Sequence, residues 1–202
     1  MALIVGITGG IGSGKTAATD LFAARGITIV DADLASRIIM EPGKPALDAV
    51  AKHFGDHLLL PDGTLDRAAL RARVFANDDD RLWLESLTHP LIGKEISEQL
   101  AASDSAYTML SSPLLLETGQ HGSTDYTIVV DVPEAMQVAR TMARDNNYEE
   151  QVRRIIAAQM SRQDRLARAD RVIDNSGTLV ELKEQVARIH EELLQRATAA
   201  EG

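Results

Sequence analysis

The sequence predicts an α/β fold in which helices cover both faces of a five-stranded parallel sheet. Short apolar runs rich in β-branched residues recur along the chain, and segments of helical periodicity separate them. A glycine-rich loop follows the first run directly and leads into a helical segment. Hydrophobic residues make up 45% of the 202 residues and aromatic residues only 3%, which predicts one domain with an aliphatic core.

The first two strands are expected near the N-terminus. Residues 3–8 form an apolar run that ends at glycines, as in a buried strand. Apolar residues repeat at helical spacing over 17–22, and Gly26 is placed to end that helix. Residues 27–30 predict a second strand, which ends at the segment Asp31-Ala32-Asp33.

The segment between the second and third strands contains more helix than one crossover requires. Residues 34–106 are expected to be mostly helical, with turns at 41–43 and 61–63. Asn77 precedes three aspartates, which is typical of a helix cap followed by an acidic first turn. Because a βαβ unit needs only one helix, the surplus predicts an inserted helical subdomain.

Three further strands are predicted in the second half of the chain, at residues 107–110, 126–132 and 171–174. Apolar residues then repeat at steps of three and four between Leu179 and Leu193, which predicts a terminal helix.

The loop after the first strand matches the P-loop pattern G-x-x-x-x-G-K-[ST]. Its glycines let backbone N–H groups surround an anion, the lysine reaches the β- and γ-phosphates, and the threonine hydroxyl can bind Mg²⁺. A dinucleotide-binding fingerprint is excluded, because Lys15 stands where the third glycine would fall. The predicted nucleotide-binding residues are Gly10, Ile11, Gly12, Ser13, Gly14, Lys15 and Thr16, with Thr16 also the metal ligand and Lys15 also catalytic.

A P-loop indicates a nucleotide but leaves the reaction open among a small-molecule kinase, a GTPase and an ATPase motor. The chain lacks the N-K-x-D motif that reads guanine and the L-S-G-G-Q-like signature of transport ATPases. A D-x-x-G match at Asp174–Gly177 lies too late in the chain to be a GTPase switch. The kinase interpretation is therefore favoured.

A kinase that phosphorylates a hydroxyl benefits from a carboxylate that orients the hydroxyl and accepts its proton. Asp31 and Asp33 follow the second strand, at the sheet edge where parallel sheets bind ligands. A spacing of two would point both to one side if the strand continued that far. The alternative is an acidic turn that caps the next helix.

Eight of the 21 basic residues, all arginine, lie between Arg140 and Arg171. Arg140 and Arg144 share a helix face, as do Arg162 and Arg165. Arginine suits the bidentate binding of phosphate oxygens, so a mobile arm that closes over the nucleotide is one interpretation. A solvated helix face paired with the interspersed acids is the other.

Charge and composition restrict the partners. A net charge of −9 argues against affinity for nucleic acid or for an anionic membrane. No apolar run reaches the roughly 18 residues needed to span a bilayer. No signal peptide is evident and no cysteine is present, which together favour the cytoplasm.

The chain resembles the bacterial dephospho-coenzyme A kinases over essentially its whole length. The resemblance rests on an ordered set of segments: Gly6–Thr16, Asp31–Asp33, Glu41–Gly43, Phe75–Asn77, His89–Ile92, Pro113–Glu117, Val130–Val132, the Gln159-x-x-Arg162-x-x-Arg165 run, and Ala169–Gly177. Thr16 replaces the serine common in that family, a change that is equivalent for Mg²⁺.

The resemblance implies phosphorylation of the ribose 3′-hydroxyl of dephospho-CoA with ATP and Mg²⁺, the last step of coenzyme A synthesis. It also implies a three-layer P-loop kinase fold like that of the nucleoside-monophosphate kinases. In that fold the core would be residues 1–33, 107–133 and 156–202, the coenzyme-binding insertion 34–106, and the lid 134–155.

Carried over to this chain, the resemblance suggests roles for individual residues. Asp33 looks like the base and Arg140 like a catalytic lid arginine. Asn175, Gly177 and Arg144 would lie near the nucleotide. The substrate side would include Thr8, Asp33, His89, Pro90, Glu117 and Arg162. A nucleoside or nucleotide kinase, or a P-loop binding module without catalysis, remains an alternative.

Overall fold

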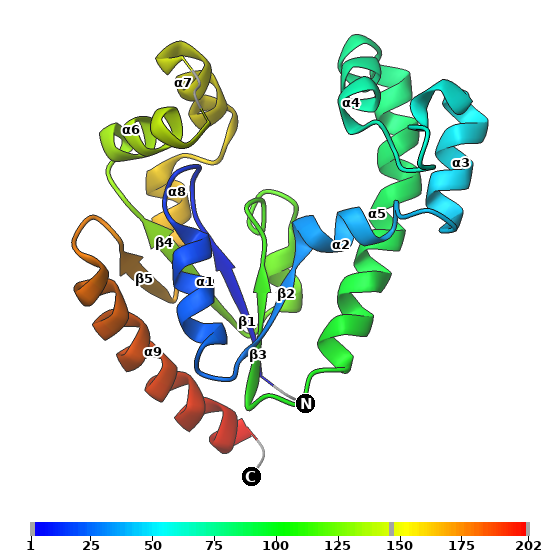
Figure 1. Ribbon diagram of the computed structural model, residues 1–202. Coiled ribbons are helices and arrows are strands. Elements are labelled where there is room, and N and C mark those ends of the chain that lie inside the picture. Colours follow the sequence, from blue (N-terminus) through cyan, green and yellow to red (C-terminus); the bar gives the residue numbers. More distant parts are fainter. Residues whose placement is uncertain (1–2, 146–147, 201–202) are drawn as a thin grey trace. The chain divides into compact units, whose positions relative to one another are not determined.

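The computed structural model describes residues 3–145 and 148–200 (Figure 1). The chain divides into two compact units, one of residues 1–30 and 103–202 and the other of residues 31–102.

Five strands form one sheet in the order β2-β3-β1-β4-β5. They are β1 (Leu3–Thr8), β2 (Thr28–Asp31), β3 (Tyr107–Ser111), β4 (Tyr126–Asp131) and β5 (Arg171–Asp174). The pairs β1–β3, β1–β4 and β4–β5 all run parallel. The predicted parallel α/β fold is confirmed.

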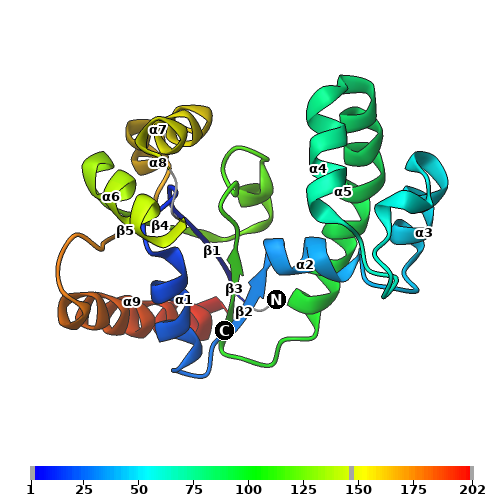
Figure 2. The same ribbon diagram turned by 45° about the horizontal axis from the view of Figure 1, so that its top comes forward.

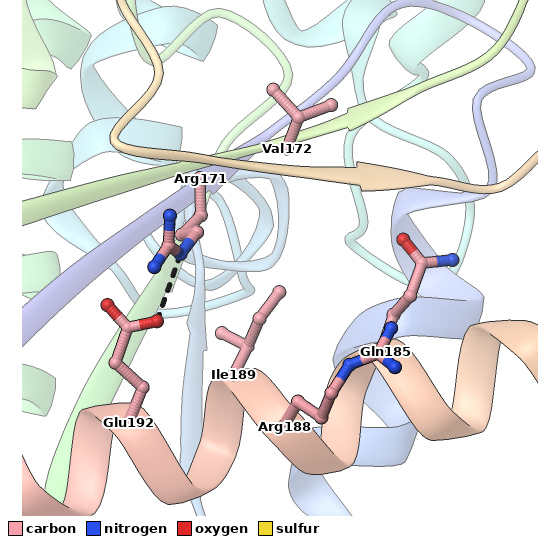
Figure 3. Close-up of a pocket in the computed structure, with 6 residues that line it drawn as sticks. All are labelled: Arg171, Val172, Gln185, Arg188, Ile189 and Glu192. Atoms are coloured by element: carbon pink, nitrogen blue, oxygen red, sulfur yellow. Dashed lines mark hydrogen bonds and ion pairs between the residues drawn. The ribbon is translucent and has the colours of Figure 1, made fainter.

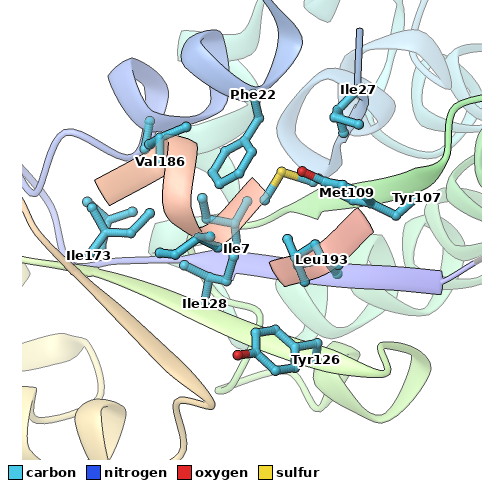
Figure 4. Close-up of a cluster of buried hydrophobic side chains, with 14 of the residues drawn as sticks. Ile7, Phe22, Ile27, Tyr107, Met109, Tyr126, Ile128, Ile173, Val186 and Leu193 are labelled. Atoms are coloured by element: carbon cyan, nitrogen blue, oxygen red, sulfur yellow. The ribbon is translucent and has the colours of Figure 1, made fainter. Parts of the chain in front are cut away.

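The main core lies between the sheet and two helices, α1 (Lys15–Ala23) and α9 (Leu179–Ala200). Phe22 of α1 and Leu193 of α9 are fully buried against Ile7 and Ile128 of the central strands (Figure 4). The terminal helix is confirmed, although Leu179 in its first turn is 58% exposed. Burial of aliphatic side chains on this face fixes β1, and with it the loop that follows.

Three helices follow β4 and lie beside the loop between β1 and α1, as Figures 1 and 2 both show. They are α6 (Glu134–Asp145), α7 (Glu149–Ala158) and α8 (Arg162–Ala167). The expected lid boundary at residue 155 falls inside α7, and residues 146–147 of that segment lie outside the described residues. A short 3-10 helix, η2 (Gln120–Ser123), lies between β3 and β4.

The second unit is helical and has a core of its own. Its elements are α2 (Ala32–Ile38), α3 (Pro45–Phe54), the 3-10 helix η1 (Asp56–Leu58), α4 (Arg67–Ala76) and α5 (Asp78–Ala101). Leu47 and Val50 of α3 and Leu70 of α4 are among its buried residues. The Asn77 side chain accepts hydrogen bonds from the Asp79 and Asp80 amides, so the predicted cap of this long helix is confirmed. No helix within residues 3–145 and 148–200 is long and apolar enough to cross a membrane.

Candidate nucleotide-binding site at the carboxyl edge of the sheet

The predicted P-loop connects the end of β1 at Thr8 with the start of α1 at Lys15, so the expected strand–loop–helix context is confirmed. The Ser13 N–H donates to the Gly10 carbonyl at 3.0 Å and closes a turn within the loop. Gly12 and Gly14 have φ values of 71° and 85°. Side chains rarely adopt these left-handed conformations, so glycine is required at both positions.

The loop glycines also let neighbouring side chains approach closely. A Cβ at Gly10 would collide with the Gln137 amide and lie 2.9 Å from Nη1 of Arg165. A Cβ at Gly12 would lie 2.7 Å from both the Gln137 carbonyl oxygen and the Thr141 hydroxyl. The first half of the loop is therefore packed against α6.

The Lys15 side chain is directed to the carboxyl end of β3. Its Nζ donates to the Ser111 hydroxyl at 2.5 Å, and Ser111 is in register with Ile7 of β1. This bond holds the ammonium group at the edge formed by the two central strands, where phosphate charge would be bound. The role of Ser111 was missed in the sequence, because a serine that ends a strand carries no distinctive pattern.

Thr16 lies in the first turn of α1 and is exposed. Within the described residues, no hydrogen bond occupies its hydroxyl, and no group of three or more His, Cys, Asp or Glu side chains is arranged to hold a metal. A hydroxyl beside a phosphate-binding loop fits Mg²⁺, which usually takes its other ligands from phosphates and water.

Asn175, which follows β5, connects the P-loop to α6. Its Nδ2 donates to the Ser13 carbonyl at 2.8 Å, and its own carbonyl accepts from Nη2 of Arg140 at 3.0 Å. Its N–H donates to the Asp131 carbonyl at the end of β4. The structure thus brings together Asn175, Arg140 and the loop.

Gly177 lies two residues further on, in an exposed loop. A Cβ there would collide with the Glu181 carboxylate, which accepts from the Thr178 amide at 2.6 Å. This glycine therefore accommodates the cap of α9, and among the described residues no hydrogen bond links it to the P-loop.

Arg162 binds Asp131 through two donors. Its Nε and Nη2 lie 2.9 and 2.6 Å from the carboxylate oxygens of Asp131, which is nearly buried at the end of β4. These hydrogen bonds and the attraction to Asp131 raise the pKa of the Arg162 guanidinium. Asp131 was not predicted as a site residue, although a carboxylate that ends the clearest strand was a usable signal.

Arg165 and Glu117 fix the short connection between α7 and α8. Nη2 of Arg165 donates to the Met160 carbonyl at 2.7 Å, and the Glu117 carboxylate accepts from the Met160 N–H at 3.0 Å. Burial lowers the pKa of Arg165, an effect that the nearby Glu117 and Asp131 carboxylates oppose. Glu117 itself is exposed.

The remaining arginines of the cluster lie on the surface. Arg144 binds the adjacent Asp145 with two hydrogen bonds, and Arg153 and Arg154 form ion pairs with glutamates one turn earlier. The interpretation as a solvated face paired with acids therefore applies to these three arginines, whereas the arm that closes over the nucleotide stays a prediction. Arg140, Arg162 and Arg165 turn toward the sheet edge, whereas Arg144, Arg153 and Arg154 form ion pairs on a solvated face.

Thr8 ends β1 and is buried, and its hydroxyl donates to the Pro113 carbonyl at 3.3 Å. This bond connects β1 to the segment that follows β3.

The two candidate bases occupy different elements, so the condition under which both would point to one side of a strand is not met, and Asp31 forms the helix cap that was the alternative. β2 ends at Asp31, and α2 begins at Ala32. The Asp31 carboxylate caps α2 by accepting from the amides of Asp33 and Leu34 at 2.8 and 3.1 Å. Asp33 lies in the first helical turn, is exposed, and has no side-chain hydrogen bond within the described part of the chain. The strand ends at Asp31 because this cap stabilises a helix start there.

His89 and Pro90 lie inside α5, and both are exposed. The next residue, Leu91, lines a cavity of about 210 Å³ together with residues of α3, including Ala46. This cavity lies within the helical unit.

Of two cavities in the sheet-containing unit, one is lined by a predicted site residue and the other is not. One of about 260 Å³ is lined by Gln137, Gln159, Arg162 and Arg165, beside the P-loop. Another of about 290 Å³ lies between β5 and α9, where Arg171 and Glu192 form an ion pair of 2.9 Å (Figure 3). The second contains none of the predicted site residues.

Comparisons with known proteins identify the family of the chain. The model of the Dephospho-CoA kinase family matches residues 3–181. The Dephospho-CoA kinase of Hahella chejuensis is 49% identical over 196 residues, which cover 97% of this chain and 94% of the relative.

Solved structures show the same fold. A Thermus thermophilus protein, TT1252, superimposes with a TM-score of 0.83 at 31% identity, covering 95% of this chain and 98% of that one. The Dephospho-CoA kinase from Campylobacter jejuni has the same fold at a TM-score of 0.74 and 24% identity, covering 95% and 97% of the two chains. Since the family model and a full-length relative both match, the chain belongs to the dephospho-CoA kinase family.

Proposed function

We propose that this chain transfers the γ-phosphoryl group of ATP to the ribose 3′-hydroxyl of dephospho-CoA and so produces coenzyme A. Family membership over residues 3–181 supports the acceptor. The binding of ATP is supported by the P-loop, whose Lys15 ammonium group is held at the carboxyl ends of the central strands. ATP is the phosphoryl donor of this family.

The reaction forms a bond between the 3′-oxygen and the γ-phosphorus and breaks the bond to the oxygen that leaves with ADP. Lys15 and the loop amides offset the charge on the phosphate oxygens, which is the main catalytic requirement of phosphoryl transfer. Arg140 adds a second charge on the nucleotide side, close to Asn175. Arg144 could reach the nucleotide only after releasing Asp145.

Asp33 is the base in this proposal, and it takes the proton of the 3′-hydroxyl. An exposed carboxylate with no hydrogen-bond partner in the described chain is free to accept a hydrogen bond from a bound hydroxyl. Asp31 serves as the cap of α2 and thereby holds the turn that carries Asp33.

The helical insertion, residues 34–106, holds the acceptor in this proposal, with His89 and Pro90 among its contacts. Substrate binding would also involve Thr8, Glu117 and Arg162. Each of them positions a chain segment near the site through its hydrogen bond to Pro113, Met160 or Asp131. Residues 134–155 would act as the lid, because α6 contacts the loop and Asn175 through Gln137 and Arg140.

Mg²⁺ would be held by the Thr16 hydroxyl together with phosphate oxygens, and it would neutralise charge on the transferring group. The exposed position of Thr16 and the oxygen chemistry of its side chain support this assignment. We place the reaction in the cytoplasm, where ATP is abundant.

The test is a coupled assay of ADP release, carried out with dephospho-CoA, without any acceptor, and with a panel of nucleosides and nucleotides. We expect release that depends on dephospho-CoA alone. Release that responds instead to a nucleoside would make the chain a nucleoside kinase. If the protein bound ATP but released no ADP with any of the acceptors, it would be a P-loop binding module without catalysis.

Replacing Arg140 by lysine should already impair the enzyme. Lysine supplies the charge but not the planar set of donors that binds both the Asn175 carbonyl and a phosphate. We expect kcat to fall by about 10-fold or more for Arg140→Lys, and further for Arg140→Ala, with a smaller change in KM. Steady-state kinetics would check this, and unchanged kinetics in both variants would assign Arg140 a structural role only.

A further inference from the structure

Two glutamine side chains bind the P-loop on either side of one residue. The Ile11 N–H donates to Oε1 of Gln159 at 3.0 Å, and the Ile11 carbonyl accepts from Nε2 of Gln137 at 2.8 Å. Gln137 belongs to α6 and is 4% exposed, whereas Gln159 lies between α7 and α8. Neither was predicted from the sequence to have a role.

These bonds fix two successive peptide planes of the loop. The peptide group is planar, so its C=O and N–H point in opposite directions. Gln159 therefore orients the plane between Gly10 and Ile11, and Gln137 orients the plane between Ile11 and Gly12. Because the second plane also carries the Gly12 N–H, the bond from Gln137 to the Ile11 carbonyl directs that N–H away from α6.

The local turn explains why such bonds are needed. The bond from the Ser13 N–H to the Gly10 carbonyl closes a four-residue turn, in which Ile11 and Gly12 are the central residues. The positive φ of Gly12 is that of a type II turn. Glycine can also adopt the φ and ψ angles of a type I turn. In that form the peptide between Ile11 and Gly12 is flipped, and the Gly12 N–H points to the other side of the turn. Nothing in the loop's own sequence selects between the two.

We propose that Gln137 and Gln159 are positioning residues that select the type II form of this turn, so that the Gly12 N–H is aimed at the phosphate groups of ATP. The proposal deepens the nucleotide-binding half of the proposed function and needs no assumption about the acceptor. It also gives a reason for glycine at position 10, where a Cβ would displace the Gln137 amide.

The two positions should respond oppositely to glutamate. Gln159 acts as an acceptor, so Gln159→Glu keeps the bond, and the cavity beside it already contains Arg162 and Arg165 to balance the charge. Gln137 acts as a donor, so Gln137→Glu places a carboxylate against the Ile11 carbonyl. Methionine has a similar length and makes neither bond.

The experiment measures the Kd of a non-hydrolysable ATP analogue with Mg²⁺ by calorimetry, which requires no acceptor. We expect about a 10-fold weaker Kd for Gln137→Met and Gln159→Met, a larger loss for Gln137→Glu, and a Kd within about 3-fold of wild type for Gln159→Glu. KM for dephospho-CoA should stay unchanged in the active variants. Gln163→Met is the matched control, because Gln163 is exposed on α8 and should leave the Kd unchanged.

Melting temperatures separate positioning from folding. A purely structural role would lower the melting temperature of both methionine variants and change the Kd only in proportion to the unfolded fraction. Equal losses for Gln159→Glu and Gln159→Met, or unchanged nucleotide affinity in both methionine variants, would overturn the proposal. Absence of dephospho-CoA turnover in the wild type would contradict the proposed acceptor and leave this test intact.

Discussion

Replacement of Lys15 by alanine should reduce kcat by about 10²-fold or more, the largest loss that we expect from a single substitution. Its ammonium is held at the carboxyl ends of the central strands by the Ser111 hydroxyl. An interaction directed at the transferring phosphate is worth a few kcal/mol, and each 1.4 kcal/mol changes the rate about tenfold. The measurement is kcat from the coupled assay, with the melting temperature as a check on folding.

Lys183→Ala is the matched control for this substitution. Lys183 is exposed on α9, so the same loss of one positive charge there should leave kcat unchanged. Comparable losses in the two variants would point to a general effect of net charge. If Lys15→Ala kept most of the wild-type activity, the assignment of the loop as the phosphate site would be wrong.

Asp33→Asn should be the second most damaging change, with kcat lowered by about 10²-fold. Asparagine keeps the shape of the side chain but cannot take a proton, and a positioned general base contributes on this scale. The Kd for ATP should hardly change, because the P-loop holds the nucleotide. The measurements are kcat and the Kd for ATP in the same variant.

Asp31 provides the control for Asp33. Asparagine caps helices about as well as aspartate, so Asp31→Asn keeps the cap and should retain most activity. Asp31→Ala removes the acceptor of the Asp33 and Leu34 amides and should cost about 1 kcal/mol of folding free energy. If Asp31→Asn were the inactive variant and Asp33→Asn active, the base would be Asp31. Normal turnover in both would mean that positioning by the P-loop and arginines suffices.

The presence and position of the P-loop could be predicted, because they depend on residues adjacent in the sequence, whereas the orientation of its peptide planes could not. Only glycine fits the positive φ values at positions 12 and 14, and the lysine and threonine begin the helix that follows. The five strands could be placed for a similar reason, since an apolar β-branched run bounded by glycine or polar residues has few alternatives.

The candidate bases show where local reasoning fails. Whether residues 31–33 extend β2 or begin α2 is a competition between strand pairing and a helix cap. The spacing of two aspartates fits either outcome. The capping bonds of Asp31 decide it, and they place two residues that look equivalent in the sequence in different elements.

By itself, the sequence determined the fold class, the phosphate-binding loop and the resemblance to one kinase family, because each depends on residue types at short, regular spacings. Only the tertiary structure decided which arginines turn to the sheet edge, and that Ser111, Asp131, Gln137 and Gln159 lie at the candidate site. The partners of Gln137 and Gln159 lie 126 and 148 residues away along the chain. Hydrogen bonds over such separations leave no periodic pattern, since packing of the sheet and helices alone brings their donors and acceptors together.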